Sequence, residues 1–198
     1  MIKVYKYNGQ TEDECRIKCI EELDVYACDI ITKSTEEDGV INMEAIKKED
    51  VTNYIKEYIK QVEKSMNIEI NLEVRETEEI FNVTMVSNNN PILIGKEGRT
   101  LNSLQLLLRQ TISNMTGFNI KVNLDASNYR AKKVKYFEYD IKNIVREVQK
   151  SKLDVKLDPM NSYQRRIIHS LVSNYENLET ESVGEEPNRY VIIKYVGK

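Results

Sequence analysis

The sequence predicts an α+β protein built from three small units. Segments with the two-residue period of strands and segments with the 3.6-residue period of helices follow one another in mixed order. The chain has 198 residues, of which 40% are hydrophobic and 31% charged, which is typical of a globular chain long enough for several small units. We expect the units to cover residues 1–43, 44–126 and 127–198.

The first unit is predicted to be a βαβ element. Residues 2–7 alternate as a strand, and residues 28–32 are predicted to form a second strand. Between them, Thr11 with Glu14 three residues later forms a capping-box pattern, which predicts a helix over residues 12–23. The acidic, glycine-terminated segment 34–39 (STEEDG) is predicted to be a loop.

The second unit has the predicted order αββααβ. An apolar stripe predicts a helix over residues 44–66, and two alternating segments at 68–75 and 80–86 form a hairpin. A short helical turn begins at Pro91, the tetrapeptide GKEG interrupts it, and a strong helix follows over residues 99–115. Residues 118–125 alternate again and complete the unit as a strand.

The third unit has the predicted order α-β-α-β-β. A long helix is expected over residues 127–150 and a short strand over 155–157. A second helix over 161–174 then leads to two strands, at 178–183 and 189–196.

Charge is distributed unevenly along the chain. The net charge of −3 excludes a uniformly basic nucleic-acid binder. Residues 1–90 carry 11 basic and 20 acidic residues, whereas residues 91–135 carry 8 basic and 2 acidic residues. A basic block within an acidic chain indicates one local surface for an anion such as a phosphate backbone, although a solvated helix face would show the same pattern.

The segment most suggestive of chemistry is the glycine loop, which we define as Ile94, Gly95, Lys96, Glu97, Gly98 and Arg99. Glycines at both ends allow a phosphate chain to approach the backbone, and amides at the start of the following helix favour an anion. Lys96 and Arg99 add positive charge. A GxxG tetrapeptide alone would more often be a plain turn between helices. Between a hairpin and a strong helix, however, it resembles the type II KH domain, which would span residues 44–126.

In KH domains this loop clamps the backbone of about four unpaired nucleotides. The resemblance therefore implies that the six residues of the glycine loop contact RNA, with Ile94 in the base groove or in the core. Arg130, Lys132 and Lys133, further along the basic block, are expected to form a supporting basic surface.

A second candidate site lies in the third unit, where Arg165 and His169 are four residues apart and share one helix face. Both residues fall at the edge of the apolar stripe, so His169 could equally be a packed boundary residue. The surrounding segments LDPMNSYQRRIIHSLV and ETESVGEEPNRYVIIKY resemble the R-3-H domain, a small module that binds single-stranded nucleic acid. The resemblance implies that Arg165, Arg166 and His169 contact RNA.

A type II KH domain followed directly by an R-3-H domain resembles the Jag family, also called SpoIIIJ-associated or KhpB. The resemblance covers nearly the whole chain but weakens after residue 32, where KSTEEDGVINMEA replaces the glycine- and phenylalanine-rich motif of many members. It implies a bacterial, cytoplasmic protein that binds small or messenger RNA, a post-transcriptional regulator linked to cell-envelope processes. It also implies a small KH-only partner protein, and it leaves homo-oligomerisation open.

Other functional classes find little support. The sequence has one histidine, no second cysteine pair to complete a zinc site, no GxxxxGK[ST] loop and no GxSxG motif, so we expect no metal, no cofactor and no catalysis. No apolar segment is long enough to span a membrane and the N-terminus lacks a signal peptide, so we expect a cytoplasmic location. Two alternatives remain: binding of single-stranded DNA, and a protein-interaction adaptor that docks through the acidic half. An adaptor would show no salt-dependent binding to short RNA.

Overall fold

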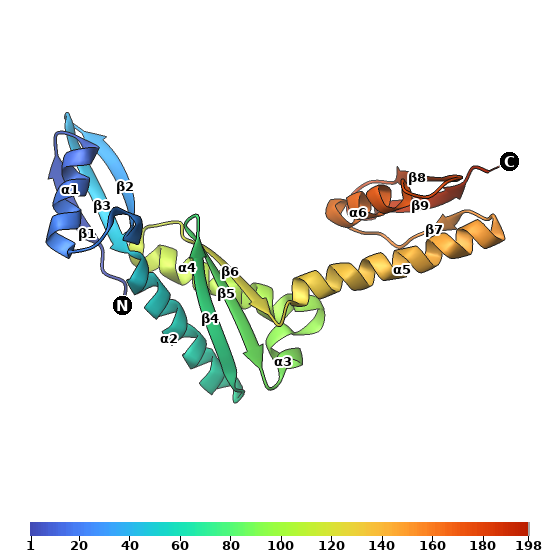
Figure 1. The fold of residues 1–198 in the computed structure, drawn as a ribbon, viewed down its shortest axis with the longest axis horizontal. Coiled ribbons are helices and arrows are strands. Elements are labelled where there is room, and N and C mark those ends of the chain that lie inside the picture. The colour runs from blue at the N-terminus through green and yellow to red at the C-terminus, as the bar shows by residue number, and fades with distance from the viewer. Residues whose placement is uncertain (198) are drawn as a thin grey trace. The chain divides into compact units, whose positions relative to one another are not determined.

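In a computed structural model of the chain, residues 1–197 are described and form two compact units (Figure 1). The first unit is Met1–Tyr129 and the second begins at Arg130. Within the described residues the strands form three small sheets, each combined with helices, which confirms the α+β class. Lys198, the last residue of the predicted third unit, lies outside the described residues.

The first unit begins with a three-stranded antiparallel sheet covered by one helix. Its elements are β1 (Tyr5–Gly9), α1 (Glu12–Leu23), a short 3-10 turn η1 (Ala27–Asp29), β2 (Ile30–Glu37) and β3 (Val40–Lys47). The strand order is β1-β3-β2. The hydroxyl of Thr11 accepts a hydrogen bond from the Glu14 amide at 3.2 Å, which starts α1 at the predicted residue.

The predicted loop over residues 34–39 is wrong, and with it the βαβ order. Residues 34–37 continue β2, and the turn is confined to Asp38 and Gly39, whose φ angles are +51° and +74°. A two-residue turn with positive φ at both positions matches the twist of a hairpin. Residues 40–47 therefore form β3, the central strand, and the next helix begins at Lys48 instead of Glu44. The segment is βαββ.

A salt-bridged cluster spans the three strands of this sheet. Glu44 on the central strand lies opposite Lys6 on β1 and Lys33 on β2. Its carboxylate oxygens lie 2.7 Å from Nζ of Lys33 and 2.8 Å from Nζ of Lys6. Hydrogen bonds from Lys33 and Lys6 lower the pKa of Glu44, so their contribution to stability is present at neutral pH and is lost as the pH falls through that lowered pKa.

The rest of the first unit corresponds to the second predicted unit, residues 44–126, and it confirms the predicted αββααβ order. The elements are α2 (Lys48–Met66), β4 (Ile70–Thr77), β5 (Ile80–Ser87), α3 (Asn90–Ile94), a 3-10 turn η2 (Lys96–Gly98), α4 (Arg99–Thr116) and β6 (Lys121–Ala126). Strands β4 and β5 are antiparallel, whereas β5 and β6 are parallel. The parallel pair requires a crossover, and α3 and α4 provide it.

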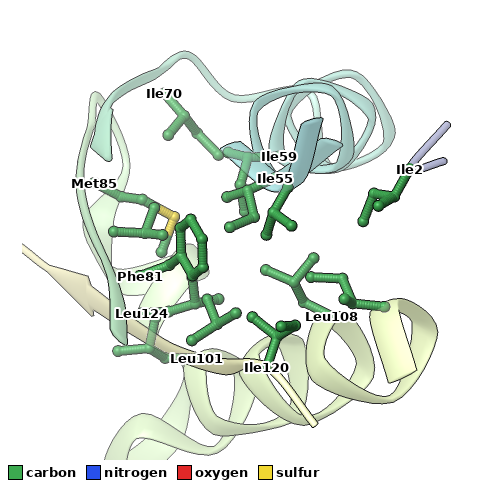
Figure 2. Packing of buried hydrophobic residues seen from close by; sticks show 14 of the residues in the cluster. Ile2, Ile55, Ile59, Ile70, Phe81, Met85, Leu101, Leu108, Ile120 and Leu124 are labelled. Atoms are coloured by element: carbon green, nitrogen blue, oxygen red, sulfur yellow. The ribbon is translucent and has the colours of Figure 1, made fainter. Parts of the chain in front are cut away.

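One hydrophobic core joins the two parts of the first unit. Figure 2 shows Phe81 of β5 close to Met85 and Leu124, with side chains of α2 and α4 around them. Ile2, Ile31 and Ile46 come from the N-terminal sheet region and belong to the same buried cluster. On the other face of that sheet, alternate residues such as Met43 pack with α1. The boundary at residues 43 and 44 stays a prediction, since both sides contribute to one core.

The second unit of the structure corresponds to the third predicted unit, residues 127–198, and it confirms the predicted α-β-α-β-β order. Its elements are α5 (Tyr129–Ser151), of which the first residue still belongs to the first unit, β7 (Val155–Lys156), α6 (Ser162–Val172), β8 (Leu178–Val183) and β9 (Tyr190–Tyr195). The strands pair antiparallel in the order β7-β9-β8. Buried side chains of α5 and α6 pack with those of the sheet in a separate core.

The shared core predicts that Ile46→Ala destabilises the whole first unit. Ile46 is fully buried, so we expect a loss of about 2–5 kcal/mol in the free energy of unfolding. Val40 lies on the same strand and is 37% exposed, so Val40→Ala is the matched control and should change little. Urea unfolding of the full chain measures both variants. Equal, small effects would show that the N-terminal sheet does not depend on this core.

Candidate nucleic-acid interface

The glycine loop connects two buried anchors. Leu93 on α3 and Leu101 on α4 are almost completely buried in the core of the first unit, and Ile94 packs against the same cluster. The chain must therefore change direction between them. The Gly95 amide donates to the carbonyl of Pro91 at 2.9 Å, and the Gly98 amide donates to the carbonyl of Gly95 at 3.2 Å. These bonds hold the loop in one conformation.

Both glycines are required by this conformation. Gly95 has φ +71° and Gly98 has φ +85°, in the left-handed region that side chains rarely adopt. A Cβ atom on Gly95 would clash with the side chain of Thr100, and one on Gly98 would lie 2.8 Å from the Tyr129 ring. Glu97 between them also has a positive φ, +56°. The loop is therefore closely packed at both glycines, where a larger residue would need a strained φ and would meet Thr100 or Tyr129.

The loop presents positive charge at the start of a long helix. Lys96, Glu97 and Arg99 are exposed, whereas Gly98 is buried. Within residues 1–197, neither Lys96 nor Arg99 forms an ion pair. Helix α4 extends for 18 residues from Arg99, so the amides of its first turn and its dipole favour an anion at the same end. The Glu97 carboxylate is the opposing charge in the loop.

The basic block divides between structural and exposed cations. Arg109 on α4 donates from Nε to the Val122 carbonyl at 2.6 Å and from Nη2 to Oδ1 of Asn123 at 3.0 Å. It therefore ties α4 to β6. The predicted supporting residues Arg130, Lys132 and Lys133 are all exposed at the start of α5. They belong to the second unit, whereas the glycine loop belongs to the first.

Arg165 and His169 both make structural contacts within the second unit. Arg165 is only 7% exposed, and its guanidinium donates to the Met160 carbonyl at 2.6 Å and to Oε1 of Glu186 at 2.7 Å. The two ring nitrogens of His169 lie 2.6 Å from the Thr180 hydroxyl and 2.7 Å from the Ser182 hydroxyl. Both hydroxyls are on β8, and a hydroxyl can donate or accept, so either ring tautomer is satisfied.

Arg166 differs from the other two residues of this motif because it is exposed. It lines a groove of about 710 Å³ together with Lys142 of α5 and Tyr163 of α6. Neither Arg166 nor Lys142 has an ion-pair partner within the described part of the chain. Arg166 is thus placed to contact a ligand directly, whereas Arg165 and His169 are placed to hold α6. The RNA contacts of all three residues stay predictions.

Comparison with known proteins places this geometry in a family. Residues 52–124 match the family model of the KhpA/KhpB KH domain, and residues 140–195 match that of the R-3-H domain. The RNA-binding protein KhpB of Clostridium symbiosum is 40% identical over 151 residues, which are 75% of this chain and 68% of that protein. The chain belongs to the KhpB family.

Other KhpB proteins match with lower identity. The RNA-binding protein KhpB of Bacillus subtilis is 29% identical over 189 residues, covering 94% of this chain and 88% of that protein. The protein of the same name from Lactiplantibacillus plantarum is 29% identical over 137 residues, which are 42% of its length. The match to the KhpB family confirms the resemblance that the sequence motifs predicted.

KhpB-family membership also bears on catalysis. The matched models are of KH and R-3-H domains, and the names of the relatives describe RNA binding. Among residues 1–197, no three His, Cys, Asp or Glu side chains come together as a metal site. Within the same residues, no helix combines the length and apolar character needed to cross a membrane.

The contacts of the R-3-H pair predict that Arg165→Ala and His169→Ala destabilise the second unit. Each variant removes two hydrogen bonds, which contribute about 1 kcal/mol apiece, and Arg165→Ala also leaves the Met160 carbonyl without its donor. The melting temperature should fall for both. Ser170→Ala changes an exposed residue of the same helix and is the control.

RNA affinity measured on the folded fraction of the same variants separates structure from binding. We expect it to change little, because Arg165 is engaged by Met160 and Glu186. An unchanged melting temperature together with a large loss of affinity would show that the pair contacts RNA directly.

Proposed function

We propose that this chain binds unpaired RNA by holding the sugar–phosphate backbone in the glycine loop, residues 94–99. One observation carries the proposal: Lys96 and Arg99 are exposed at the start of α4, and neither forms an ion pair within residues 1–197. A phosphate beside these two cations would also meet the positive end of the α4 dipole. The KH match over residues 52–124 and the printed names of the relatives support RNA as the ligand.

The second unit is proposed to add affinity through its exposed cations. Arg166 and Lys142 line the groove between α5 and α6, while Arg130, Lys132 and Lys133 are exposed at the start of α5. Cations at such positions neutralise phosphates without reading base sequence. Arg165 and His169 would act indirectly, by fixing the helix that carries Arg166.

The wider role is proposed from the family. We infer that the ligand is small or messenger RNA and that the chain acts in the cytoplasm, where such RNA is made and used, as a post-transcriptional regulator. Its link to cell-envelope processes rests on the resemblance alone. Leu106 and Leu107 on α4 are 64% and 53% exposed, and two adjacent exposed leucines support a protein partner at this helix, either a small KH-only protein or a second copy of the chain.

The loop is tested by replacing Lys96 and Glu97 together with Asp. The double variant places two carboxylates where the phosphate should lie, so affinity for a short unpaired RNA should fall at least tenfold, about 1.4 kcal/mol. The fold should persist because both side chains are exposed and Asp tolerates the positive φ of position 97. Fluorescence anisotropy with labelled RNA measures the affinity.

The chain offers a matched control for this variant. Lys56 and Glu57 on α2 form the same dipeptide and are also exposed, so Lys56→Asp with Glu57→Asp changes the net charge equally at a distant position. Its affinity should stay close to that of the unmodified chain. Equal losses in the two variants would mean that net charge alone determines binding, and the glycine loop would not be the clamp.

A further inference from the structure

Helix α5, the long yellow-to-orange helix in Figure 1, has a solvent-facing side with an unusual composition. Its core side carries the buried residues Ile141, Val145 and Val148. On a helical wheel, seven residues lie within an arc of about 100° on the opposite side, and one of them is Asn143. We call the other six the α5 stripe: Lys132, Lys135, Tyr136, Tyr139, Arg146 and Lys150, all of them exposed.

The two tyrosines of the stripe have no structural role in the described chain. Tyr136 is 70% exposed and Tyr139 is 61% exposed. Within residues 1–197, neither ring makes a hydrogen bond or a ring contact. Their spacing of three residues places them beside each other on the helix surface. Two neighbouring aromatic rings left in water are typical of a surface that binds a ligand.

The four cations of the stripe are equally free of acidic partners. Within the described residues, Lys132, Lys135, Arg146 and Lys150 form no ion pair, and Arg146 donates only to Oδ1 of Asn143, at 3.4 Å. The carboxylates of Asp140 and Glu147 fall at one edge of the arc. The stripe therefore has cations before and after the tyrosines and carries net positive charge.

We propose that the α5 stripe is a second contact surface for unpaired RNA, with bases stacked on Tyr136 and Tyr139 and phosphates beside the surrounding lysines and arginine. Surfaces that bind single strands without base preference combine aromatic platforms with cations in this way. The inference rests on the proposed function in taking RNA as the ligand. A protein partner is less well matched, because the tyrosines are the only large hydrophobic side chains exposed on α5, all of whose residues are described.

The stripe is long enough to require its own stretch of RNA. From Lys132 to Lys150 the helix rises about 27 Å. The glycine loop of a KH domain takes about four nucleotides. A short RNA is therefore used up by the loop, whereas a longer one has unpaired nucleotides left for a second surface. RNA length becomes the variable that separates the two surfaces.

The test uses the full chain with the variant Tyr136→Ala, Tyr139→Ala and oligo-uridines of about 5 and about 15 nucleotides. Affinity for the longer RNA should fall at least tenfold, while affinity for the shorter RNA stays unchanged. Alanine favours helix, so α5 should be retained, which circular dichroism checks. Tyr26→Ala is the control, because Tyr26 is 78% exposed and lies outside the stripe.

Charge provides a second readout. For Lys132→Gln with Lys135→Gln, the slope of log K against log[salt] for the longer RNA should become less steep by about 1.4, from roughly 0.7 per phosphate contact on a single strand. An unchanged slope would mean that these lysines do not neutralise phosphates and would overturn their part in the proposal.

Three results would overturn the stripe as a whole. One is unchanged affinity of the tyrosine variant for the longer RNA, and another is an equal loss for both RNAs. The third is altered self-association in sedimentation with RNA binding intact, which would make the stripe a protein interface.

The loop variant Lys96→Asp, Glu97→Asp separates this proposal from the proposal that the glycine loop clamps RNA. If it binds both RNAs normally while the tyrosine variant loses the longer RNA, the loop clamp fails and the stripe stands.

Discussion

Between Leu93 and Leu101 the chain leaves one helix and enters another while both leucines stay in the core. That constraint places positive φ angles at Gly95, Glu97 and Gly98, and it leaves Lys96, Glu97 and Arg99 exposed. The core fixes the loop before any ligand arrives, so binding need not include the cost of ordering it. Strands β5 and β6 are parallel, and α4 forms the crossover between them. This topology also sets where α4, and with it the end of the glycine loop, is placed.

The charged side chains of this molecule fall into two groups. Some ionic groups make structural contacts: Glu44 pairs with Lys6 and Lys33 on the neighbouring strands, and Arg165 joins Met160 to Glu186. Lys33 also donates to the carbonyl of Gly117 at 3.2 Å, which joins that sheet to the end of α4. Other cations, such as Lys96 and Arg99 on the glycine loop and Lys132 and Lys135 on α5, are exposed and form no ion pair within residues 1–197. A net charge of −3 is therefore compatible with an anion-binding surface, because the acidic residues are concentrated in residues 1–90, whereas residues 91–135 carry 8 basic and 2 acidic residues.

Local signals were sufficient for much of the fold. The capping pair Thr11 and Glu14, the alternation over β4 and the glycines of the loop each act within a few residues, so the sequence predicted α1, the hairpin and the loop correctly. Strand β3 was missed because its turn is only two residues long and lies within an acidic segment that favoured a loop. The alternation of Ile41, Met43 and Ala45 was the signal available.

The candidate site was harder to predict where contacts are distant in sequence. The pairing of Arg165 with Glu186 spans 21 residues, and the approach of His169 to Thr180 and Ser182 spans a helix and a turn. Spacing alone placed Arg165 and His169 at the edge of the apolar face of α6. It could not show that Arg165 is buried. Tyr136 and Tyr139 were overlooked because twelve tyrosines are spread along the chain, although their position among the lysines of α5 was visible.

The central claim is that the backbone of the glycine loop receives the phosphates of unpaired RNA. Titration of the ¹⁵N-labelled full chain with a short oligo-uridine, followed by amide chemical shifts, tests it most directly. The account predicts that the amides of Gly95, Lys96, Glu97 and Gly98 and of the first turn of α4 shift first and most strongly. Unshifted loop amides, together with clear shifts on the acidic sheet of β1, β2 and β3, would contradict it.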